Sequence, residues 1–197
     1  MSLKIAISGQ PGTGKTQIFS KLKSNPWFVS KKTAFEKNEI AGYLDHEQVV
    51  KSQYHLIDVY IEKLLQNLNS NVSVYDKSVL DTLPVSMSSG LKGQAPSSLV
   101  NTVLIKVSSY LKYYDKIYVI LDEEKPYYNE YQKIQRLFAG KKNIEFLEGM
   151  SEKTIYNKII LDSEDYLKRK RIQNNEDSNQ WFTTFGQDYI NTSPQES

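Results

Sequence analysis

The sequence feature that most constrains the fold is a glycine-rich loop between an apolar run and a helical pattern near the N-terminus. Residues 3–7 (LKIAI) form a short apolar run, as expected of a strand that is buried on both faces. Residues 9–16 (GQPGTGKT) form the loop, and residues 17–22 then take up a helical pattern. The order strand, loop and helix is the start of a β-α-β unit, and it favours an α/β protein.

The loop matches the phosphate-binding pattern G-x-x-x-x-G-K-[ST] at every fixed position. Its glycines let backbone amides turn inward around a phosphate, where a Cβ would block the approach. Lys15 is expected to reach the β- and γ-phosphates, and the Thr16 hydroxyl to ligate magnesium. The loop therefore predicts that the chain binds ATP with Mg²⁺ as cofactors. The predicted contacts are Gly9, Gly12, Thr13, Gly14, Lys15, Thr16 and Gln17.

Strand-like and helix-like patterns alternate along the rest of the chain. Apolar residues recur at steps of three and four from His46 to Leu68, which predicts a long amphipathic helix. Further helices are expected from about residue 79, over 96–113, over 125–140 and over 151–170, and further strands within 25–35, 71–76, 115–122 and 142–152. The alternation implies a three-layer sandwich, in which helices cover both faces of a parallel five-stranded sheet.

Length, charge and composition favour a globular protein and argue against a secreted or membrane-spanning one. The 197 residues suffice for one domain with a sizeable core, and the 39% of hydrophobic residues is ordinary for a globular protein. A formal net charge of +2 does not indicate a nucleic-acid partner, although it leaves one open. The chain has no cysteine, and its N-terminal apolar run is too short for a signal peptide or a membrane span. We expect a cytoplasmic protein without a membrane partner.

The composition changes near the C-terminus. Residues 168–197 are polar and poor in aliphatic side chains, so we predict a domain over 1–167 and a flexible tail over 168–197. Trp181, Phe182 and Phe185 are the exception in this tail, and they are candidates for docking onto the domain or a partner.

A phosphate-binding loop names the cofactor and not the reaction, so a second motif is needed. The guanine-reading N-K-x-D and the D-x-x-G switch of GTPases do not occur in the sequence. An ATPase would have an apolar strand that ends in Asp-Glu, and residues 117–123 (IYVILDE) fit this pattern. In that reading, Asp122 would hold magnesium through water and Glu123 would polarise the attacking water.

A different segment, residues 74–86 (VYDKSVLDTLPVS), resembles the Asp-Arg-Ser segment of the thymidylate kinase and deoxynucleoside kinase superfamily. It is similar above all to the version found in P-loop kinases of bacteria and phages. The resemblance implies that Asp76 lies near magnesium and the acceptor, and that Lys77 contacts phosphate or the phosphorylated substrate. Lys77 stands where the family has arginine, so it keeps the charge but loses the bidentate fork.

Other segments follow the family in the same order. Residues 113–137 occupy the place of a strand and a mobile lid, where the family clamps the triphosphate with arginines. Lys125, Lys133 and Arg136 are the cations available here, and Arg136 is the predicted ATP contact. Residues 144–159 match the last strand, the turn around the adenine and the final helix. Gln53 stands where some members read a nucleobase, although an exposed helix residue is the alternative.

The resemblance implies an ATP-dependent kinase. Magnesium on Thr16 and Asp76 would bridge the phosphates, and Lys15 would stabilise the charge on the transferred group. The general base is open among Asp76, Glu36 and Asp81. The acceptor would be a nucleoside, a nucleotide or a nucleotide-like group, including one within a polynucleotide. The alternatives are an ATPase that is coupled to a partner and a nucleotide-binding module without turnover. The oligomeric state is open.

Overall fold

The computed structural model describes residues 3–25, 28–31, 45–66 and 72–169. The chain divides into two compact units, Met1–Asn157 and Lys158–Ser197. Glu36 and the three aromatic residues of the tail lie outside the described residues, and the predicted boundary at residue 167 stays a prediction. No helix in the described parts of the chain is long and apolar enough to cross a membrane.

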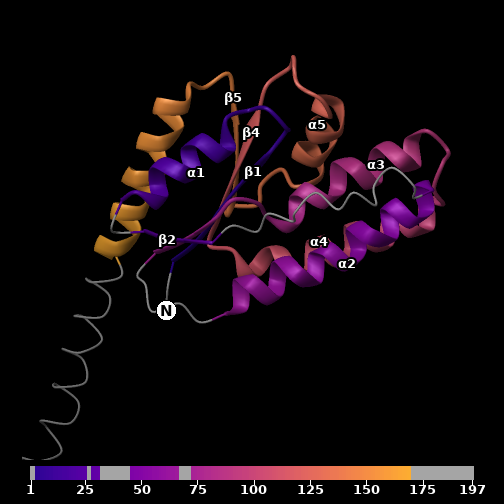
Figure 1. The fold of residues 1–197 in the computed structure, drawn as a ribbon, viewed down its shortest axis with the longest axis horizontal. Helices are drawn as coiled ribbons and strands as arrows, with labels where there is room; N and C mark the ends of the chain where they lie inside the picture. Colours follow the sequence, from indigo (N-terminus) through magenta and orange to yellow (C-terminus); the bar gives the residue numbers. More distant parts are fainter. Residues whose placement is uncertain (1–2, 26–27, 32–44, 67–71, 170–197) are drawn as a thin grey trace, which may run out of the picture. The chain divides into compact units, whose positions relative to one another are not determined.

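A parallel sheet forms the centre of the first unit, and it confirms the predicted α/β class. Its strands lie in the order β2-β3-β1-β4-β5 (Figure 1). They are β1 (Leu3–Gly9), β2 (Phe28–Lys31), β3 (Val72–Tyr75), β4 (Lys116–Leu121) and β5 (Ile144–Glu148). The strand of the glycine-rich loop is central, with β3 on one side and β4 on the other, so three strand ends meet at this edge.

The helices begin and end close to the predicted positions. They are α1 (Lys15–Lys23), α2 (His46–Leu65), α3 (Leu83–Leu91), α4 (Ser97–Tyr110), α5 (Tyr128–Leu137) and a last helix over 152–169. Short 3₁₀ turns, η2 (Val79–Thr82) and η3 (Leu111–Tyr113), precede α3 and follow α4. The long helix α2 starts at residue 46 because Asp45 and Gln48 form a capping box, in which Asp45 accepts from the Gln48 amide at 2.7 Å.

The two faces of the sheet carry different helices (Figure 1). Alternate residues of a strand point to opposite faces. Ala6, Ile117 and Val119 belong to one buried cluster with apolar residues of α2, α4 and α5. The neighbouring Ile5 and Ile7 are equally buried but lie outside that cluster, and α1 contacts the sheet through β1, β2 and β3. The central strand is therefore apolar in both directions, as the continuous run in the sequence predicts.

A half-buried lysine joins α2 to α4. The Lys106 ammonium forms an ion pair with Asp58 at 2.7 Å and donates to the Tyr54 carbonyl at 3.1 Å. It also lies 3.6 Å from the centroid of the Tyr54 ring. Only 11% of the Lys106 side chain is exposed, but 55% of the Asp58 side chain is, so water still screens the ion pair in part. These contacts hold the middle of α2, which carries pocket-lining side chains, against its neighbour.

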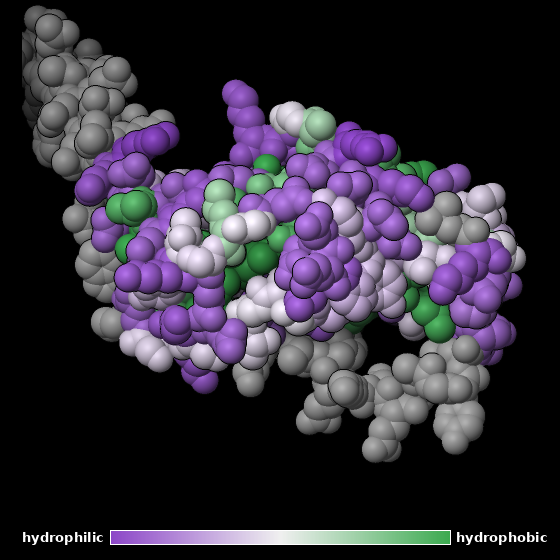
Figure 2. All heavy atoms as spheres, turned by 90° about the horizontal axis from the view of Figure 1, so that it is seen from above, coloured by the Kyte–Doolittle hydropathy of each residue, from purple (hydrophilic) through white to green (hydrophobic). Residues whose placement is uncertain are grey.

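Large apolar side chains are exposed singly and on different elements. On the face in Figure 2, hydrophilic residues cover most of the surface and apolar residues show between them. Ile105 lies on α4, Leu137 on α5 and Met150 after β5. Among the described residues of α2, Leu65 is the only large apolar side chain that is exposed. Scattered exposure of this kind is normal for a protein surface and does not mark an interface.

Gly9, the first glycine of the loop, is required by the packing of β1 against β4. Its φ is 131°, and a Cβ at this position would lie 2.2 Å from the Ile120 carbonyl oxygen. We therefore expect Gly9→Ala to lower the free energy of unfolding by about 3 kcal/mol, from overpacking and backbone strain together. Urea denaturation followed by circular dichroism measures this loss.

Gly140 provides the matched control for this substitution. It also has a positive φ, 85°, but a Cβ there would meet no atom within 4 Å. Gly140→Ala should therefore cost only the strain of the left-handed conformation, about 1 kcal/mol. Equal losses in the two variants would show that the close approach to Ile120 does not matter.

Candidate active site

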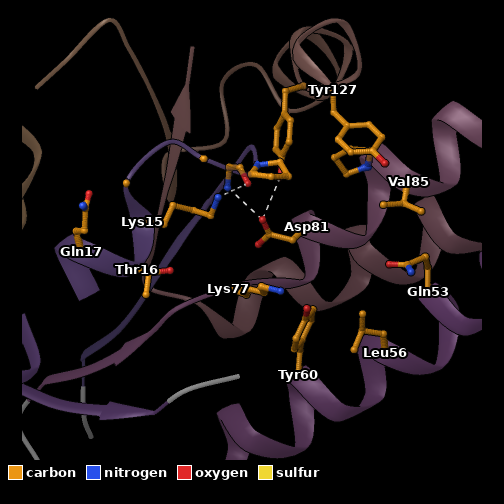
Figure 3. Close-up of a pocket in the computed structure, with 16 residues that line it drawn as sticks. Lys15, Thr16, Gln17, Gln53, Leu56, Tyr60, Lys77, Asp81, Val85 and Tyr127 are labelled. Carbon is orange, nitrogen blue, oxygen red and sulfur yellow. Dashed lines mark hydrogen bonds between the residues drawn. The ribbon is translucent and has the colours of Figure 1, made fainter. Parts of the chain in front are cut away.

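A pocket of about 710 Å³ opens where the ends of β1 and β3 meet the loop that leads into α5 (Figure 3). The glycine-rich loop forms one part of its wall, and α2, α3 and α5 contribute the rest. The lining residues are Gly9, Pro11, Gly12, Gly14, Lys15, Thr16, Gln17, Gln53, Leu56, Tyr60, Lys77, Asp81, Pro84, Val85, Tyr127 and Tyr131. Crevices beyond the carboxyl ends of parallel strands are the usual ligand sites of open α/β sheets.

The glycine-rich loop has the geometry of an anion site. Gly14 adopts a left-handed conformation with φ 79°, and its carbonyl accepts hydrogen bonds from the amides of Gln17 at 3.0 Å and Ile18 at 3.1 Å. These bonds start α1 directly after the loop, so the N-terminal end of the helix dipole faces the pocket. The Thr16 and Gln17 side chains lie in the lining, while the Thr13 hydroxyl donates to the Gln10 carbonyl at 2.9 Å.

The Lys15 ammonium folds back onto the loop. It donates to the Gly9 carbonyl at 2.7 Å and to the Gln10 carbonyl. Burial lowers the pKa of the Lys15 side chain; the charge of Asp81 opposes this shift, Lys77 adds to it, and Asp76 opposes it. Two cations, Lys15 and Lys77, therefore line one pocket, and a bound polyanion would relieve the cost of keeping Lys15 charged.

Asp81 is a hydrogen-bond hub between three segments. Its Oδ1 accepts from the Gly9 amide at 3.1 Å and from the Tyr131 hydroxyl at 3.0 Å. Its Oδ2 accepts from the Ser78 amide at 2.8 Å. Burial raises the pKa of the Tyr131 hydroxyl, and the Asp81 carboxylate raises it further, so Tyr131 stays a donor. Because both carboxylate oxygens are engaged, Asp81 is less available as a general base than as a fixed acceptor.

The segment after β3 lies beside the glycine-rich loop. Lys77 lines the pocket, and Asp76 is close enough to shift the pKa of Lys15, although it is not part of the described lining. The Ser78 hydroxyl lies 2.5 Å from the Ser8 hydroxyl on β1. The structure thus brings Asp76, Lys77 and the loop together, as the resemblance implies, because β3 is the direct neighbour of β1.

Magnesium coordination by Thr16 and Asp76 stays a prediction. Among the described residues, no group of three or more His, Asp or Glu could hold a metal ion. This does not conflict with a magnesium site, because Mg²⁺ is commonly held by one or two protein oxygens together with waters and substrate phosphates. The Thr16 hydroxyl at the start of α1 could supply one such oxygen ligand.

The acids of the ATPase alternative lie at the other side of the loop. The Asp122 amide donates to the Gln10 side chain at 2.7 Å, and the Asp122 carboxylate accepts from the Glu124 amide at 3.0 Å. Glu123 is exposed, and neither acid is part of the described lining of the pocket. Asp122 therefore stabilises the turn between β4 and α5 in this structure.

The segment compared above with a mobile lid is a packed helix. Tyr131 and Ile134 of α5 are buried in the core cluster, and six residues connect Leu137 to β5. Arg136, the predicted ATP contact, is exposed in the last turn of α5 and does not belong to the described lining. Lys125 is closer, because its side chain lies 3.7 Å from the position that a Cβ of Gly12 would take.

Several residues that line the pocket or support its loops were not singled out from the sequence. Gln10 occupies a variable position of the loop motif, and Tyr127 and Tyr131 lie in a stretch that reads only as a helix. Leu56 and Tyr60 follow Gln53 at steps of three and four along α2, so the three residues share one face of the helix. Once Gln53 is placed at the site, this spacing could have predicted that Leu56 and Tyr60 line it too.

The comparisons with known proteins concern the fold. No protein-family model matches the sequence, and no curated protein is significantly similar to it. A deoxyadenosine kinase from M. mycoides with bound dATP has a TM-score of 0.61 at 16% identity, over 81% of this chain and 98% of the kinase. The same kinase with its products dCMP and dCDP has a TM-score of 0.63 at 14% identity, over 83% and 100% of the chains.

A third structure, NadR in complex with NAD and AMP-PNP, has a TM-score of 0.57 at 16% identity. The match covers 76% of this chain and 45% of NadR. Together with the complete phosphate-binding loop, these likenesses show that the chain has the fold of the P-loop nucleoside and nucleotide kinases.

Removal of the Lys15 charge should affect turnover far more than folding. We expect Lys15→Ala to lower the turnover of ATP by roughly 100- to 1000-fold, the scale for losing one preorganised group that stabilises developing charge. Steady-state turnover of labelled ATP measures the loss, and a thermal melt confirms that the variant is folded. Near-normal turnover in a folded variant would remove the loop lysine from the chemistry.

Replacement of Asp81 should lower the free energy of unfolding. In Asp81→Asn, an amide group replaces one of the two accepting oxygens, so a buried backbone or tyrosine donor loses its partner, at a cost of about 1–3 kcal/mol. Asp122→Asn is the control, because 40% of the Asp122 side chain is exposed and its loss should stay within about 0.5 kcal/mol. Chemical denaturation of both variants tests the difference, and equal stabilities would contradict the role of Asp81 as a hub.

Proposed function

We propose that the protein is an ATP-dependent kinase that transfers the γ-phosphoryl group to a nucleoside, a nucleotide or a nucleotide-like acceptor. The observation that carries this proposal is the shape of one pocket. The glycine-rich loop occupies one part of it, and an apolar and aromatic wall from α2 and α3 occupies the adjoining part. A phosphate donor and a second, ring-bearing substrate can therefore share the pocket.

The residues around the loop support the donor half of this reaction. Lys15 and Lys77 would neutralise charge on the phosphates, and the N-terminus of α1 would bind them through its free amides. Magnesium would be held by Thr16, by the phosphates and, directly or through water, by Asp76. The solved structures with a similar fold contain dATP and AMP-PNP, which agrees with a nucleoside triphosphate as ligand.

The other half of the pocket supports an acceptor with a planar ring. Leu56, Tyr60 and Val85 supply apolar surface, and Gln53 supplies one amide group. Figure 3 shows Gln53 and Val85 on one side of the pocket and Lys15 and Thr16 on the other. A side-chain amide beside apolar walls can bind a nucleobase edge through two hydrogen bonds. The M. mycoides kinase carries dCMP and dCDP as products, which is compatible with this acceptor class.

The general base stays open among the candidates. Asp81 accepts three hydrogen bonds from Gly9, Ser78 and Tyr131, which favours a structural role for it, and Asp76 follows β3 beside the glycine-rich loop. Glu36 lies outside the described residues and stays a candidate.

The reaction can be tested with labelled ATP and a panel of nucleosides, nucleotides and single-stranded DNA. Label in an acceptor supports the kinase, and the acceptor that gives the highest kcat/KM identifies the substrate class. Release of free phosphate alone would support the partner-coupled ATPase. Binding of ATP without either product would leave a nucleotide-binding module.

Two matched asparagine variants separate the kinase from the ATPase. Asp76→Asn should lower phosphoryl transfer by roughly 100-fold or more while ATP binding is largely kept, because the charge matters when metal and acceptor are aligned. Asp122→Asn should retain most of the activity, since Asp122 holds the turn after β4. Turnover and calorimetric ATP binding are measured for both. An inactive Asp122→Asn beside an active Asp76→Asn would reverse the assignment.

A further inference from the structure

The side chain of Gln10 connects the glycine-rich loop to the segment between β4 and α5. It is fully buried. Its amide nitrogen donates to the carbonyls of Lys125 at 2.9 Å and Pro126 at 3.1 Å, and its amide oxygen accepts from the Asp122 amide at 2.7 Å. One side chain thus satisfies three backbone groups of a loop more than a hundred residues away, which fixes the path of the chain up to residue 127.

Tyr127, the next residue, has an unusual backbone conformation. Its φ of 64° and ψ of 18° are left-handed, and it is the only non-glycine residue with a positive φ in the described part of the chain. A left-handed conformation of a bulky residue is strained, and it persists where the surrounding structure imposes it. Tyr127 is the N-cap of α5, a position where Asn, Asp or Gly would start the helix without this strain.

The strain at Tyr127 is imposed from both sides. Gln10 holds the two carbonyls that precede it. One turn later, the Tyr131 amide donates to the Tyr127 carbonyl at 3.0 Å, and the Tyr131 hydroxyl donates to Asp81. The backbone at Tyr127 is therefore held between Gln10, which belongs to the glycine-rich loop, and Tyr131, whose partner Asp81 accepts from the Gly9 amide of β1.

The imposed conformation places the Tyr127 side chain in the lining of the pocket. Figure 3 shows Tyr127 on the α5 side, across the pocket from Leu56 and Tyr60 of α2. All three side chains line the same pocket. A planar ring bound between α2 and α5 would have an aromatic or apolar surface on each face.

We propose that Tyr127 is a binding residue for the ring of the acceptor, and that Gln10 is a positioning residue that acts through Tyr127. The proposal deepens the kinase function and rests on its acceptor class. It assigns to Gln10, a variable position of the phosphate-binding motif, a role in acceptor binding and not in phosphate binding. The strain in the Tyr127 backbone lowers stability, and the same conformation places the Tyr127 ring in the pocket.

Alanine and glycine variants of two adjacent tyrosines test the strain. Both substitutions remove the ring, but only glycine relieves a left-handed backbone. Tyr127→Gly should therefore melt a few degrees higher than Tyr127→Ala. The order should reverse at Tyr128, which has an ordinary φ at the start of α5, so that Tyr128→Ala melts above Tyr128→Gly. The same order at both positions would overturn the claim of strain.

Nucleoside binding tests the contact. Isothermal calorimetry is carried out with adenosine, cytidine, thymidine and their 5′-monophosphates on the full chain. Tyr127→Ala should weaken the binding of the preferred nucleoside by about 10- to 100-fold, the scale for losing one stacking contact with a base. Tyr127→Phe should recover most of this loss, because it restores the ring. Tyr128→Ala is the control, because Tyr128 is not part of the described lining.

A double-mutant cycle tests the route by which Gln10 acts. Gln10→Ala should weaken nucleoside binding in the native background and have little further effect in the Tyr127→Ala background. Hydrogen exchange provides an independent readout, since the Asp122 amide should lose protection in Gln10→Ala. Additive losses in the cycle would show that Gln10 acts elsewhere and would overturn its positioning role.

The outcomes separate this inference from the proposed reaction. If nucleosides bind in a Tyr127-dependent way but no phosphoryl group is transferred, the kinase function fails and the inference stands. If phosphoryl transfer occurs and Tyr127→Ala binds its acceptor as the native chain does, the function stands and the inference is overturned. Failure of every nucleoside and nucleotide in the panel to bind the native chain also overturns the inference.

Discussion

The carboxylate of Asp81 holds together the three segments on which the site depends. The end of β1, the turn after β3 and the first turns of α5 each place a donor at one buried point: the amides of Gly9 and Ser78 and the hydroxyl of Tyr131. Backbone amides at the ends of the strands have no partner within the sheet and need another acceptor. A buried donor without an acceptor lowers the free energy of unfolding. The Asp81 side chain alone meets this need, so it ties the loop to its neighbours.

Around this hub, the pocket has a charged half and an apolar half. Lys15 and Lys77 lie near the loop, and Leu56 and Tyr60 lie on α2. Lys106 also ties the middle of α2 to α4. Phosphoryl transfer is mainly a problem of alignment and charge neutralisation, so a rigid frame with cations at one end suits the proposed chemistry.

Much of the fold could be predicted from the sequence because local patterns of residues determine its helices and strands. The glycine-rich loop requires a strand before it and a helix after it, and the spacing of apolar residues predicted the long helix that begins at His46. The resemblance to a lid segment did not reveal that Tyr131 and Ile134 are buried, because their burial depends on core residues that are distant in sequence. The local pattern shows a helix but not what the helix packs against.

The sequence by itself predicted the candidate anion site, because its parts are adjacent in the chain: three glycines, Lys15 and the first turn of α1 need only one loop conformation to meet a phosphate. Only the tertiary structure decided the roles of Gln10, Asp81 and Tyr127. Their partners lie roughly fifty or more residues away, apart from the Ser78 amide and the turn within α5, and they become neighbours because β3 and β4 flank β1. A buried polar side chain takes its function from the donors and acceptors that the fold brings to it, and a sequence pattern does not contain them.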